Sequence, residues 1–600
     1  MEASTTSGGR SAIEADTIGE ALDLTADRFG ERTAFKTRDG SLELTWTEAR
    51  RRVDAIAGGL RQLDIGPGDC VALMFGNRPE FHICDLAAVT VGATPFSIYQ
   101  TYAAGQIEYV CSDSAARVGM VEQAYLANFL EARKNLPDLE HLIVIDGEAP
   151  EGTISLAELE AMDPSFDGRA AREEIKPEDI LTLIYTSGTT GPPKGVQLSH
   201  RNLFSLVRGV KDVVHMPEGL SVISWLPSAH IAERGAHHYL PLVFGGTVHC
   251  CDDGRKIMEY LPEVRPEWFF AVPRIWEKLK AGLETRIAAQ EGEAREKAEG
   301  ALRAAIQKVR LEQAGEPVPE ELAATVAAAD AAMFVHLRKQ LGLDRALTVN
   351  VGAAPTPVEV LEFFHAIGIE LAELWGMSET SGVATCNRPG EVKIGTVGPV
   401  IPGMEIKLAE DGEVLVRGGS IMVGYRNLPE KTAETIDADG WLLTGDIGEI
   451  DEDGFLKIVD RKKELIINAA GKNMSPANIE AAIKTASPLI GQACAIGDAR
   501  SYNTALIVLD PDFAPAWAAK QGIEVGSLEG LATEESVIAA VQAGIDEAND
   551  KLARVEQIKK FTIVKGDWAP GGDELTPTMK LKRKPIGEKY EAEIESMYSK

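Results

Sequence analysis

The chain has 600 residues, which is room for several structural units, and its 44% hydrophobic and 26% charged residues are typical of a globular protein. The formal net charge of −31 argues against nucleic acid as a partner, because such a surface repels phosphate groups. The seven cysteines are odd in number and show no CxxC spacing, which excludes a disulfide framework and a zinc pattern. Because the net charge is strongly negative, an anionic substrate must be bound locally by backbone N–H groups, a metal ion or a few cationic side chains.

The N-terminus lacks the features of a targeting segment. Its first 15 residues are polar and small, without the basic start and apolar core of a signal peptide. No run of about 18 apolar residues occurs anywhere in the chain. We therefore expect a cytoplasmic protein with at most peripheral membrane contact, and the sequence leaves its oligomeric state unknown.

Helical and strand-like segments alternate from about residue 17 onwards. Thr45 is a predicted helix N-cap, and Glu48, three positions on, completes a capping box. This alternation predicts an α/β fold with a largely parallel sheet. The predicted elements of the first hundred residues are helices at 20–29, 45–63 and 80–91 and strands at 70–75 and 93–98.

The middle of the chain continues this pattern and then changes in composition. Residues 277–341 are rich in strong helix formers and predict a helical insertion with a break at 315–319. We interpret most of the charged side chains of this insertion as a solvated face. Residues 397–459 contain short strand-like runs and Gly-Asp turns, which predict a β-rich sub-domain. Further strands are predicted at 180–185, 222–226, 247–250, 268–272 and 346–351.

The most informative loop follows the predicted strand at 180–185. Residues 185–195 read Tyr-Thr-Ser-Gly-Thr-Thr-Gly-Pro-Pro-Lys-Gly, so hydroxyl and backbone N–H donors can wrap the β- and γ-phosphates of a nucleotide. It is not a Walker A loop, because Pro-Pro-Lys-Gly follows its second glycine. The candidate phosphate-binding residues are Thr186, Ser187, Gly188, Thr189, Thr190, Gly191 and Lys194.

This loop resembles the signature loop of the adenylate-forming superfamily, which includes acyl-CoA synthetases, firefly luciferase and peptide-synthetase adenylation domains. The resemblance extends over about residues 20–590, because further motifs follow in order. It implies a large N-terminal domain of stacked α/β sheets over residues 17–459, which includes the helical insertion and the β sub-domain. A flexible N-terminus over residues 1–16 precedes it. A hinge at 460–463 would join it to a small, mobile α+β C-terminal domain over 464–600.

Two motifs are implied to bind the nucleotide base and a metal ion. The small residues at 352–355 leave room for a flat ring, and the resemblance implies an adenine pocket there. Trp375 can stack on a base, Ser378 can donate to a phosphate or carboxylate, and Glu379 offers an oxygen to Mg²⁺, which Thr186 would also bind. The candidate residues of these motifs are Gly352, Ala353, Ala354, Pro355, Trp375, Gly376, Met377, Ser378 and Glu379.

Three further motif residues are implied to act around the ribose and the hinge. Asp446 can accept two hydrogen bonds from vicinal hydroxyls, which suits a ribose. Arg461 suits the ribose or the α-phosphate, and Lys463 occupies the hinge position by resemblance.

The resemblance aligns Lys580 with the catalytic lysine of adenylation, which would neutralise charge between the substrate carboxylate and the α-phosphate. Met579 stands where many relatives have glycine, although the long-chain branch commonly reads Pro-Thr-x-Lys. Lys582 is the alternative candidate.

The nature of the acid is indicated by strings that resemble the long-chain acyl-CoA synthetase branch. His230 would close the acyl pocket near the carboxylate, with a buried, hydrogen-bonded structural histidine as the alternative. We expect Gly235, His237 and His238 to line the same pocket. The strings that carry this resemblance lie at 224–233, 272–279 and 468–473.

The resemblance implies an AMP-forming long-chain fatty acid–CoA ligase that uses ATP, Mg²⁺ and coenzyme A. The carboxylate and ATP would give acyl-AMP and pyrophosphate, and the CoA thiol would then give acyl-CoA and AMP. The implied catalytic residues are Lys580, Thr186, Glu379 and His230. The alternatives are an acyl-AMP ligase, an aryl or medium-chain acid–CoA ligase, a peptide-synthetase-like adenylation module and a non-catalytic acyl or nucleotide sensor.

Overall fold

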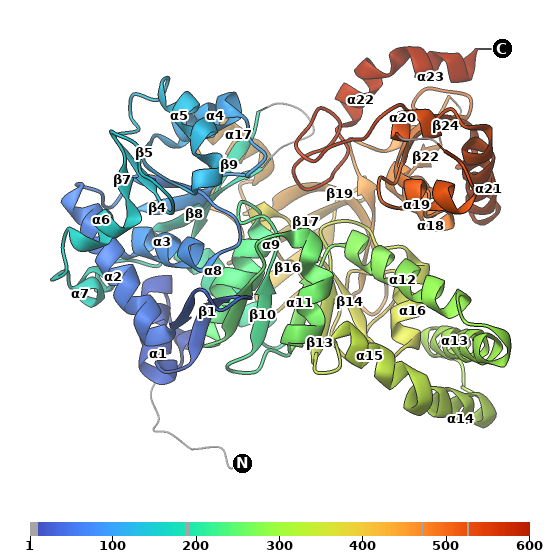
Figure 1. The fold of residues 1–600 in the computed structure, drawn as a ribbon, viewed down its shortest axis with the longest axis horizontal. Coiled ribbons are helices and arrows are strands. Elements are labelled where there is room, and N and C mark those ends of the chain that lie inside the picture. The colour runs from blue at the N-terminus through green and yellow to red at the C-terminus, as the bar shows by residue number, and fades with distance from the viewer. Residues whose placement is uncertain (1–9, 187–191, 470–471, 525–526, 600) are drawn as a thin grey trace.

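The computed structural model describes residues 10–186, 192–469, 472–524 and 527–599. A large N-terminal domain carries stacked sheets with helices, and a smaller C-terminal domain lies beside it, at the upper right of Figure 1. No helix within the described ranges is long and apolar enough to cross a membrane. All seven cysteines are free and buried.

The largest sheet has eight strands, most of them parallel. Strands β8, β4, β3, β5, β6 and β7 pair in parallel, and β9 and β18 add an antiparallel edge. The predicted α/β fold with a largely parallel sheet is therefore confirmed. In spatial order the strands are β18 (Gly424–Tyr425), β9 (Lys194–Ser199), β8 (Ile180–Thr186), β4 (Thr94–Ser97), β3 (Cys70–Met74), β5 (Ala116–Val121), β6 (His141–Val144) and β7 (Ile154–Ser155).

This sheet separates two apolar cores, as the period of two along a strand requires. In β3, Val71 and Leu73 face one core, whereas Cys70, Ala72 and Met74 face the other. Helices α2 and α3 bury residues in the first core, and α4 and α5 bury residues in the second. The helices are α2 (Trp46–Gln62), α3 (Pro79–Thr90), α4 (Ala104–Ser114) and α5 (Leu126–Arg133).

The predicted helix start at Thr45 is confirmed. The Glu48 N–H donates to Thr45 Oγ1 at 3.2 Å, and the Thr45 N–H donates to Glu48 Oε2 at 2.8 Å. Helix α1 (Ile18–Phe29) begins two residues before its predicted start and packs beside α2. The two smaller helices α6 (Leu156–Ala161) and α7 (Gly168–Glu173) complete this side of the domain.

Two four-stranded mixed sheets continue the domain. The order β10-β11-β1-β2 is parallel except for the β1–β2 hairpin, and the order β12-β13-β14-β15 is parallel except for β15. The predicted strands are confirmed to within about two residues. The strands are β1 (Thr33–Thr37), β2 (Glu43–Thr45), β10 (Ser221–Ser224), β11 (Thr247–Cys250), β12 (Trp268–Ala271), β13 (Thr348–Val351), β14 (Leu371–Trp375) and β15 (Thr385–Cys386).

The predicted helical insertion is present and projects at the lower right of Figure 1. Its helices break between residues 313 and 320, which matches the predicted break, and α14 has no buried residue. The first helix begins at Pro273, four residues before the predicted start. The elements are α12 (Pro273–Ala288), α13 (Gly292–Gln313), α14 (Glu320–Ala329), the π-helix η5 (Asp330–Phe334) and α15 (Val335–Leu341).

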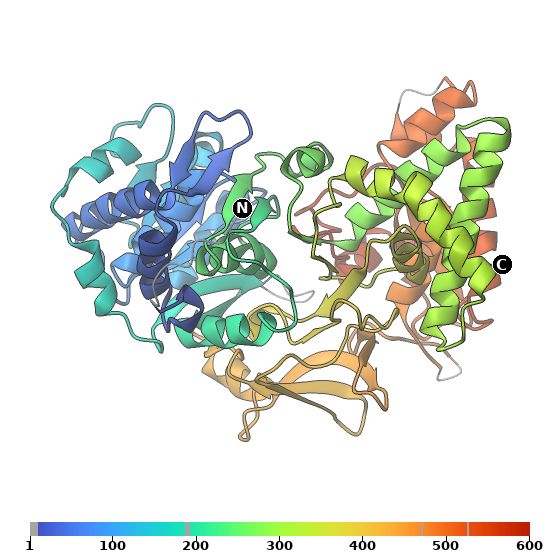
Figure 2. The ribbon, with the colours of Figure 1, turned by 90° about the horizontal axis from the view of Figure 1, so that it is seen from below.

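The β-rich sub-domain is a four-stranded antiparallel sheet, which projects at the lower edge of Figure 2. Strand β19 begins at residue 442, so the predicted ribose-binding residue Asp446 lies inside a strand, and β20 ends at Arg461, within the predicted hinge. The strands are β16 (Met404–Leu408), β17 (Glu413–Gly418), β19 (Leu442–Ile450) and β20 (Leu456–Arg461).

The C-terminal domain has apolar cores of its own, and among the described residues their buried members begin at Ile466. It contacts helix α12 through the Arg274–Asp510 ion pair and through Lys278 Nζ, 3.2 Å from Asp512 Oδ2. The domain boundaries and the hinge themselves stay predictions. The main elements are α18 (Pro476–Ala486), β23 (Ile490–Ile496), β24 (Asn503–Leu509), α21 (Glu535–Lys551), β25 (Ile558–Ile563), α22 (Arg583–Lys589) and α23 (Glu591–Tyr598).

Candidate active site

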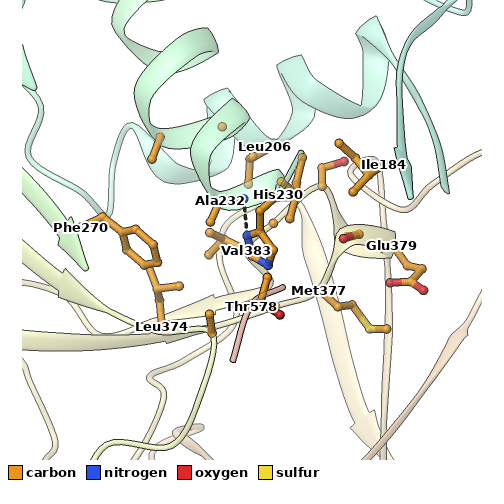
Figure 3. Close-up of a pocket in the computed structure, with 18 of the residues that line it drawn as sticks. Ile184, Leu206, His230, Ala232, Phe270, Leu374, Met377, Glu379, Val383 and Thr578 are labelled. Carbon is orange, nitrogen blue, oxygen red and sulfur yellow. Dashed lines mark hydrogen bonds between the residues drawn. The ribbon is translucent and has the colours of Figure 1, made fainter. Parts of the chain in front are cut away.

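A cavity lies where the central sheet, the β12–β15 sheet and the C-terminal domain meet. One end is polar and the other is apolar. In Figure 3, His230 lies between Glu379 and Met377 on one side and Phe270 and Leu374 on the other. The polar lining residues include Thr186, Lys194, His230, Ser378, Glu379, Arg461 and Lys580. The apolar lining residues include Leu206, Val210, Val214, Met216, Ala236, Leu240, Trp268 and Phe270.

Lys194 and Glu379 are linked at the polar end by Tyr425. Lys194 begins β9 directly opposite Thr186, the last residue of β8. Its Nζ lies 4.2 Å from the centroid of the Tyr425 ring, and the Tyr425 hydroxyl donates to Glu379 Oε1 at 2.7 Å. Burial lowers the pKa of Lys194, while the Glu379 carboxylate opposes that shift. The edge strand β18 thus positions a cation and a carboxylate near Thr186, at the start of the predicted phosphate loop.

Asp446 and Arg461 are register partners in the β19–β20 hairpin. Their side chains form an ion pair with Arg461 Nε 2.6 Å from Asp446 Oδ1, and Trp375 Nε1 donates to Asp446 Oδ2 at 2.9 Å. Burial raises the pKa of Asp446, against the guanidinium of Arg461 and the indole N–H of Trp375. Arg461 lines the cavity, and Asp446 and Trp375 lie behind it.

Lys580 reaches the cavity from a turn of the C-terminal domain. The Lys580 N–H donates to Thr576 Oγ1 at 3.0 Å, and the Thr576 N–H donates to the Lys580 carbonyl at 2.8 Å. The Lys580 residue is exposed, but the many protein atoms around its ammonium group partly desolvate it. This desolvation lowers the pKa of Lys580, as does the nearby Arg461 charge. Lys582 instead donates to the Gly572 carbonyl at 2.7 Å and does not line the cavity.

Met579 adopts the left-handed backbone conformation, with φ at +65°. Glycine adopts this conformation without steric cost, whereas residues with a Cβ do so rarely. The turn that presents Lys580 therefore keeps the geometry expected for a glycine, with a methionine in its place.

His230 is the N-cap residue of the short helix α9 (Ile231–Glu233). Its Nδ1 accepts the Ala232 N–H at 3.2 Å, which assigns the proton of the neutral ring to Nε2. Burial, together with the Lys580 charge, lowers the pKa of His230 to about 4. At neutral pH the imidazole is therefore uncharged and offers one N–H donor.

The wall next to His230 is formed by α9, the π-helix η3 (Arg234–Tyr239) and α10 (Leu240–Val243). The expectation that Gly235, His237 and His238 line the pocket together is wrong for the two histidines. His237 Nδ1 lies 2.7 Å from Glu233 Oε2, and His238 Nε2 lies 3.0 Å from Asp85 Oδ1. Their positions on the helix turn them away from the cavity, and Gly235 alone of the three lines it.

The remaining predicted residues divide between the cavity and its surroundings. Ala353, Gly376, Met377 and Ser378 line the cavity. Gly352 is buried, Ala354 and Pro355 are exposed outside the lining, and so is Lys463. Ser187, Gly188, Thr189, Thr190 and Gly191 lie outside the described residues.

Sequence reasoning missed Tyr425 and most of the apolar lining. Tyr425 belongs to no motif that we recognised, and its two-residue strand lies far from Lys194 in the sequence. On helix α8 (His200–Val210), Leu206 and Val210 recur at a spacing of four, a signal that predicts a buried face but does not identify a cavity.

Comparison with known proteins places the chain in a family. The model of the AMP-binding enzyme family matches residues 22–426, and the model of the AMP-binding enzyme C-terminal domain matches residues 463–600. A Mycobacterium tuberculosis protein named a fatty-acid–CoA ligase is 51% identical over 75% of this chain and 79% of its own length. A long-chain-fatty-acid–CoA ligase of Mycobacterium bovis is 36% identical over 93% of this chain and 92% of its own length.

Solved structures show the same fold. The adenylation domain of a carboxylate reductase from Mycobacterium chelonae superposes with a TM-score of 0.76 at 20% identity, over 98% of this chain and 92% of that domain. An anthranilate CoA ligase in complex with anthranoyl-AMP superposes with a TM-score of 0.73 at 21% identity, over 96% and 98% of the two chains. Family models match both the N-terminal and the C-terminal part of the chain, and relatives align with nearly all of it. The chain therefore belongs to the AMP-binding enzyme family.

Proposed function

We propose that this protein is an AMP-forming long-chain fatty acid–CoA ligase. The observation that carries the proposal is the continuity of the cavity. A charged end with Lys194, Glu379, Arg461 and Lys580 leads past His230 into an apolar branch. This arrangement suits a phosphate chain at one end and an aliphatic chain at the other. Relatives that align over more than nine tenths of the chain are named long-chain-fatty-acid–CoA ligases, which supports the same reading.

The first half-reaction joins two anions, the fatty carboxylate and the α-phosphate of ATP. The carboxylate oxygen attacks the α-phosphorus, the bond to the bridging oxygen breaks, and pyrophosphate leaves with that electron pair. Lys580 and Arg461 would lower the repulsion between the anions, and the Nε2–H of His230 would orient the carboxylate. No general base is needed, because a carboxylic acid with a pKa of roughly 4 is already ionised at pH 7.

The donor set at the polar end suits Mg²⁺, which binds few protein carboxylates and keeps most of its waters. Within the described ranges there is no cluster of three or more His, Cys, Asp or Glu side chains that could form a full protein cage. Glu379, oriented by Tyr425, and Thr186 would hold the ion. When bound, it would supply positive charge to the phosphate oxygens.

The ATP nucleoside would lie between the loop at 352–355 and the β19–β20 hairpin. The small residues Ala353 and Gly376 line the polar end of the cavity, where a flat base would lie. Asp446 would accept the ribose hydroxyls, with Arg461 exchanging part of its ion pair for the nucleotide. The Ser187–Gly191 stretch of the phosphate loop remains a prediction from the sequence.

The second half-reaction would need Lys580 to leave the cavity. Rotation of the C-terminal domain about Lys463 would withdraw Lys580 and admit the CoA thiol, whose sulfur attacks the acyl carbonyl as AMP leaves. The same rotation would break the Arg274–Asp510 ion pair, which holds the present arrangement. A cytoplasmic location with at most peripheral membrane contact also remains a prediction.

The test is acid-dependent AMP release measured with and without CoA, across acetate, octanoate, palmitate, oleate and benzoate. The proposal expects turnover that requires CoA and is greatest with the long-chain acids. Acyl-AMP formation without a CoA requirement would identify an acyl-AMP ligase instead. A maximum with benzoate would identify an aryl-CoA ligase, and no adenylation of any acid would contradict the proposal.

A further inference from the structure

Gly235 is buried in the π-helix η3, yet open space lies where its side chain would be. It lines the cavity beyond His230. A Cβ added at Gly235 would meet no heavy atom within 4 Å outside the chain neighbours and the helix backbone. A buried position in a packed interior normally leaves no such space. The missing side chain therefore gives the cavity its width at this point.

Two other glycines that line the cavity show that this is a special property of position 235. A Cβ at Gly376 would collide with the backbone carbonyl of Gly382. Gly382 itself has φ at +118°, a conformation that residues with a Cβ rarely adopt. Backbone packing thus explains glycine at both of these positions. Neither constraint applies to Gly235. The one evident structural effect of the missing side chain there is space inside the cavity.

The two residues directly before Gly235 are held in place by buried charges. Arg234 forms an ion pair with Asp85, and its Nη1 donates to Ser97 Oγ at 2.9 Å. Glu233 accepts hydrogen bonds from Ser224 Oγ at 2.6 Å and from the Leu226 N–H at 3.0 Å. These groups are fully buried, so a shift of the helix would leave charges unpaired in the interior. The wall therefore cannot move back to make room for a larger residue.

We propose that Gly235 determines the length of the acyl chain that the enzyme accepts. This inference rests on the proposed function and specifies how the acyl branch selects its substrate. Gly235 follows His230 by five residues, which is about 7.5 Å along the helix at about 1.5 Å per residue, or roughly six methylene groups of an extended chain. A side chain at this point would block the path beyond those methylenes and leave room for a short acid.

The test uses Gly235→Ala and Gly235→Leu, with Gly282→Leu as the matched control. Gly282 also lies inside a helix, α12, and its added Cβ would likewise meet nothing within 4 Å, but it faces solvent. Alanine and leucine are stronger helix formers than glycine, so neither substitution weakens its helix. The kcat/KM for CoA-dependent AMP release is measured with butyrate, octanoate and palmitate.

We expect Gly235→Leu to lower kcat/KM for palmitate by about 100-fold or more and to change that for butyrate by less than about threefold. Gly235→Ala should lie between the wild type and Gly235→Leu, and Gly282→Leu should match the wild type. Equal losses for butyrate and palmitate, or unchanged palmitate turnover in a variant with wild-type thermal stability, would overturn the inference.

A binding measurement keeps this inference separate from the proposed function. Equilibrium dialysis with radiolabelled palmitate and ATP reports occupancy of the cavity without turnover. Gly235→Leu should weaken palmitate binding at least about tenfold relative to Gly282→Leu. Equal binding by the two variants would refute the role of Gly235 even if no acid is turned over. Lack of long-chain turnover in the wild type would instead refute the proposed function.

Discussion

Glu373 gives a pH-dependent prediction, because it is a buried carboxyl in strand β14, which ends next to the cavity-lining residue Gly376. It lies in the middle of β14, opposite Val351, and is only 8% exposed. Burial raises the pKa of Glu373 from its ordinary 4.5 to about 7, although nearby N–H groups of Thr356 and Gly395 partly oppose the shift. The folded protein therefore holds the Glu373 proton more tightly than the unfolded chain does.

The sign of the effect follows from this difference in proton affinity. The stability that the raised pKa contributes is complete below pH 4.5 and is lost as the pH rises through 7. At about 1.4 kcal/mol per pH unit, the shift amounts to roughly 3 kcal/mol in total, of which about 2.5 kcal/mol is lost between pH 5 and pH 8. Glu373→Gln removes the titrating proton, so the variant should not lose this stability.

Urea unfolding of the large domain at pH 5 and pH 8 measures this difference. Comparing the free energies of unfolding of wild type and Glu373→Gln cancels the titration of all other groups. We expect the variant to gain about 2.5 kcal/mol relative to wild type between the two pH values. Glu370 is exposed and directly precedes β14, so Glu370→Gln should keep the wild-type difference in the free energy of unfolding between pH 5 and pH 8. A Glu373→Gln variant that loses stability in parallel with the wild type would refute the reasoning.

Three further predictions concern the polar end of the cavity. Lys580→Ala should lower the rate of ATP–pyrophosphate exchange by about 100-fold or more and leave ATP binding unchanged. Exchange near the wild-type rate would show that Lys580 has no catalytic role. Tyr425→Phe should lower kcat/KM for ATP by about 10-fold to 100-fold, because Glu379 loses a hydrogen bond of about 1.5–3 kcal/mol. The control is Tyr502→Phe, which should leave kcat/KM for ATP unchanged, because the Tyr502 hydroxyl donates to the Met597 carbonyl instead. Met579→Gly should keep pyrophosphate exchange within about threefold, because glycine adopts the left-handed conformation freely. Met579→Val should lower exchange about tenfold, because a β-branched residue adopts this conformation even less readily than methionine. Equal exchange by both variants would contradict this.

Local patterns sufficed for most elements of this fold. The capping box at Thr45, the break in the helical insertion and the alternation of strands and helices all depend on neighbouring residues, and all are confirmed. The strand through Asp446 was not predicted from the sequence. Strand β19 continues through Asp446 because pairing with both β17 and β20 stabilises residues with weak strand preference.

The chemistry of the site was indicated by motifs, but its geometry depends on contacts between distant segments. The sequence by itself determined which residue types could meet phosphate, ribose and carboxylate groups, because each motif carries its donors within a few residues. Only the tertiary structure decided that Tyr425 joins Lys194 to Glu379. It also turned His237 away from the cavity and left Gly235 facing it. The helix fixes which residues share a face, but the buried partners across the fold decide which face meets the cavity.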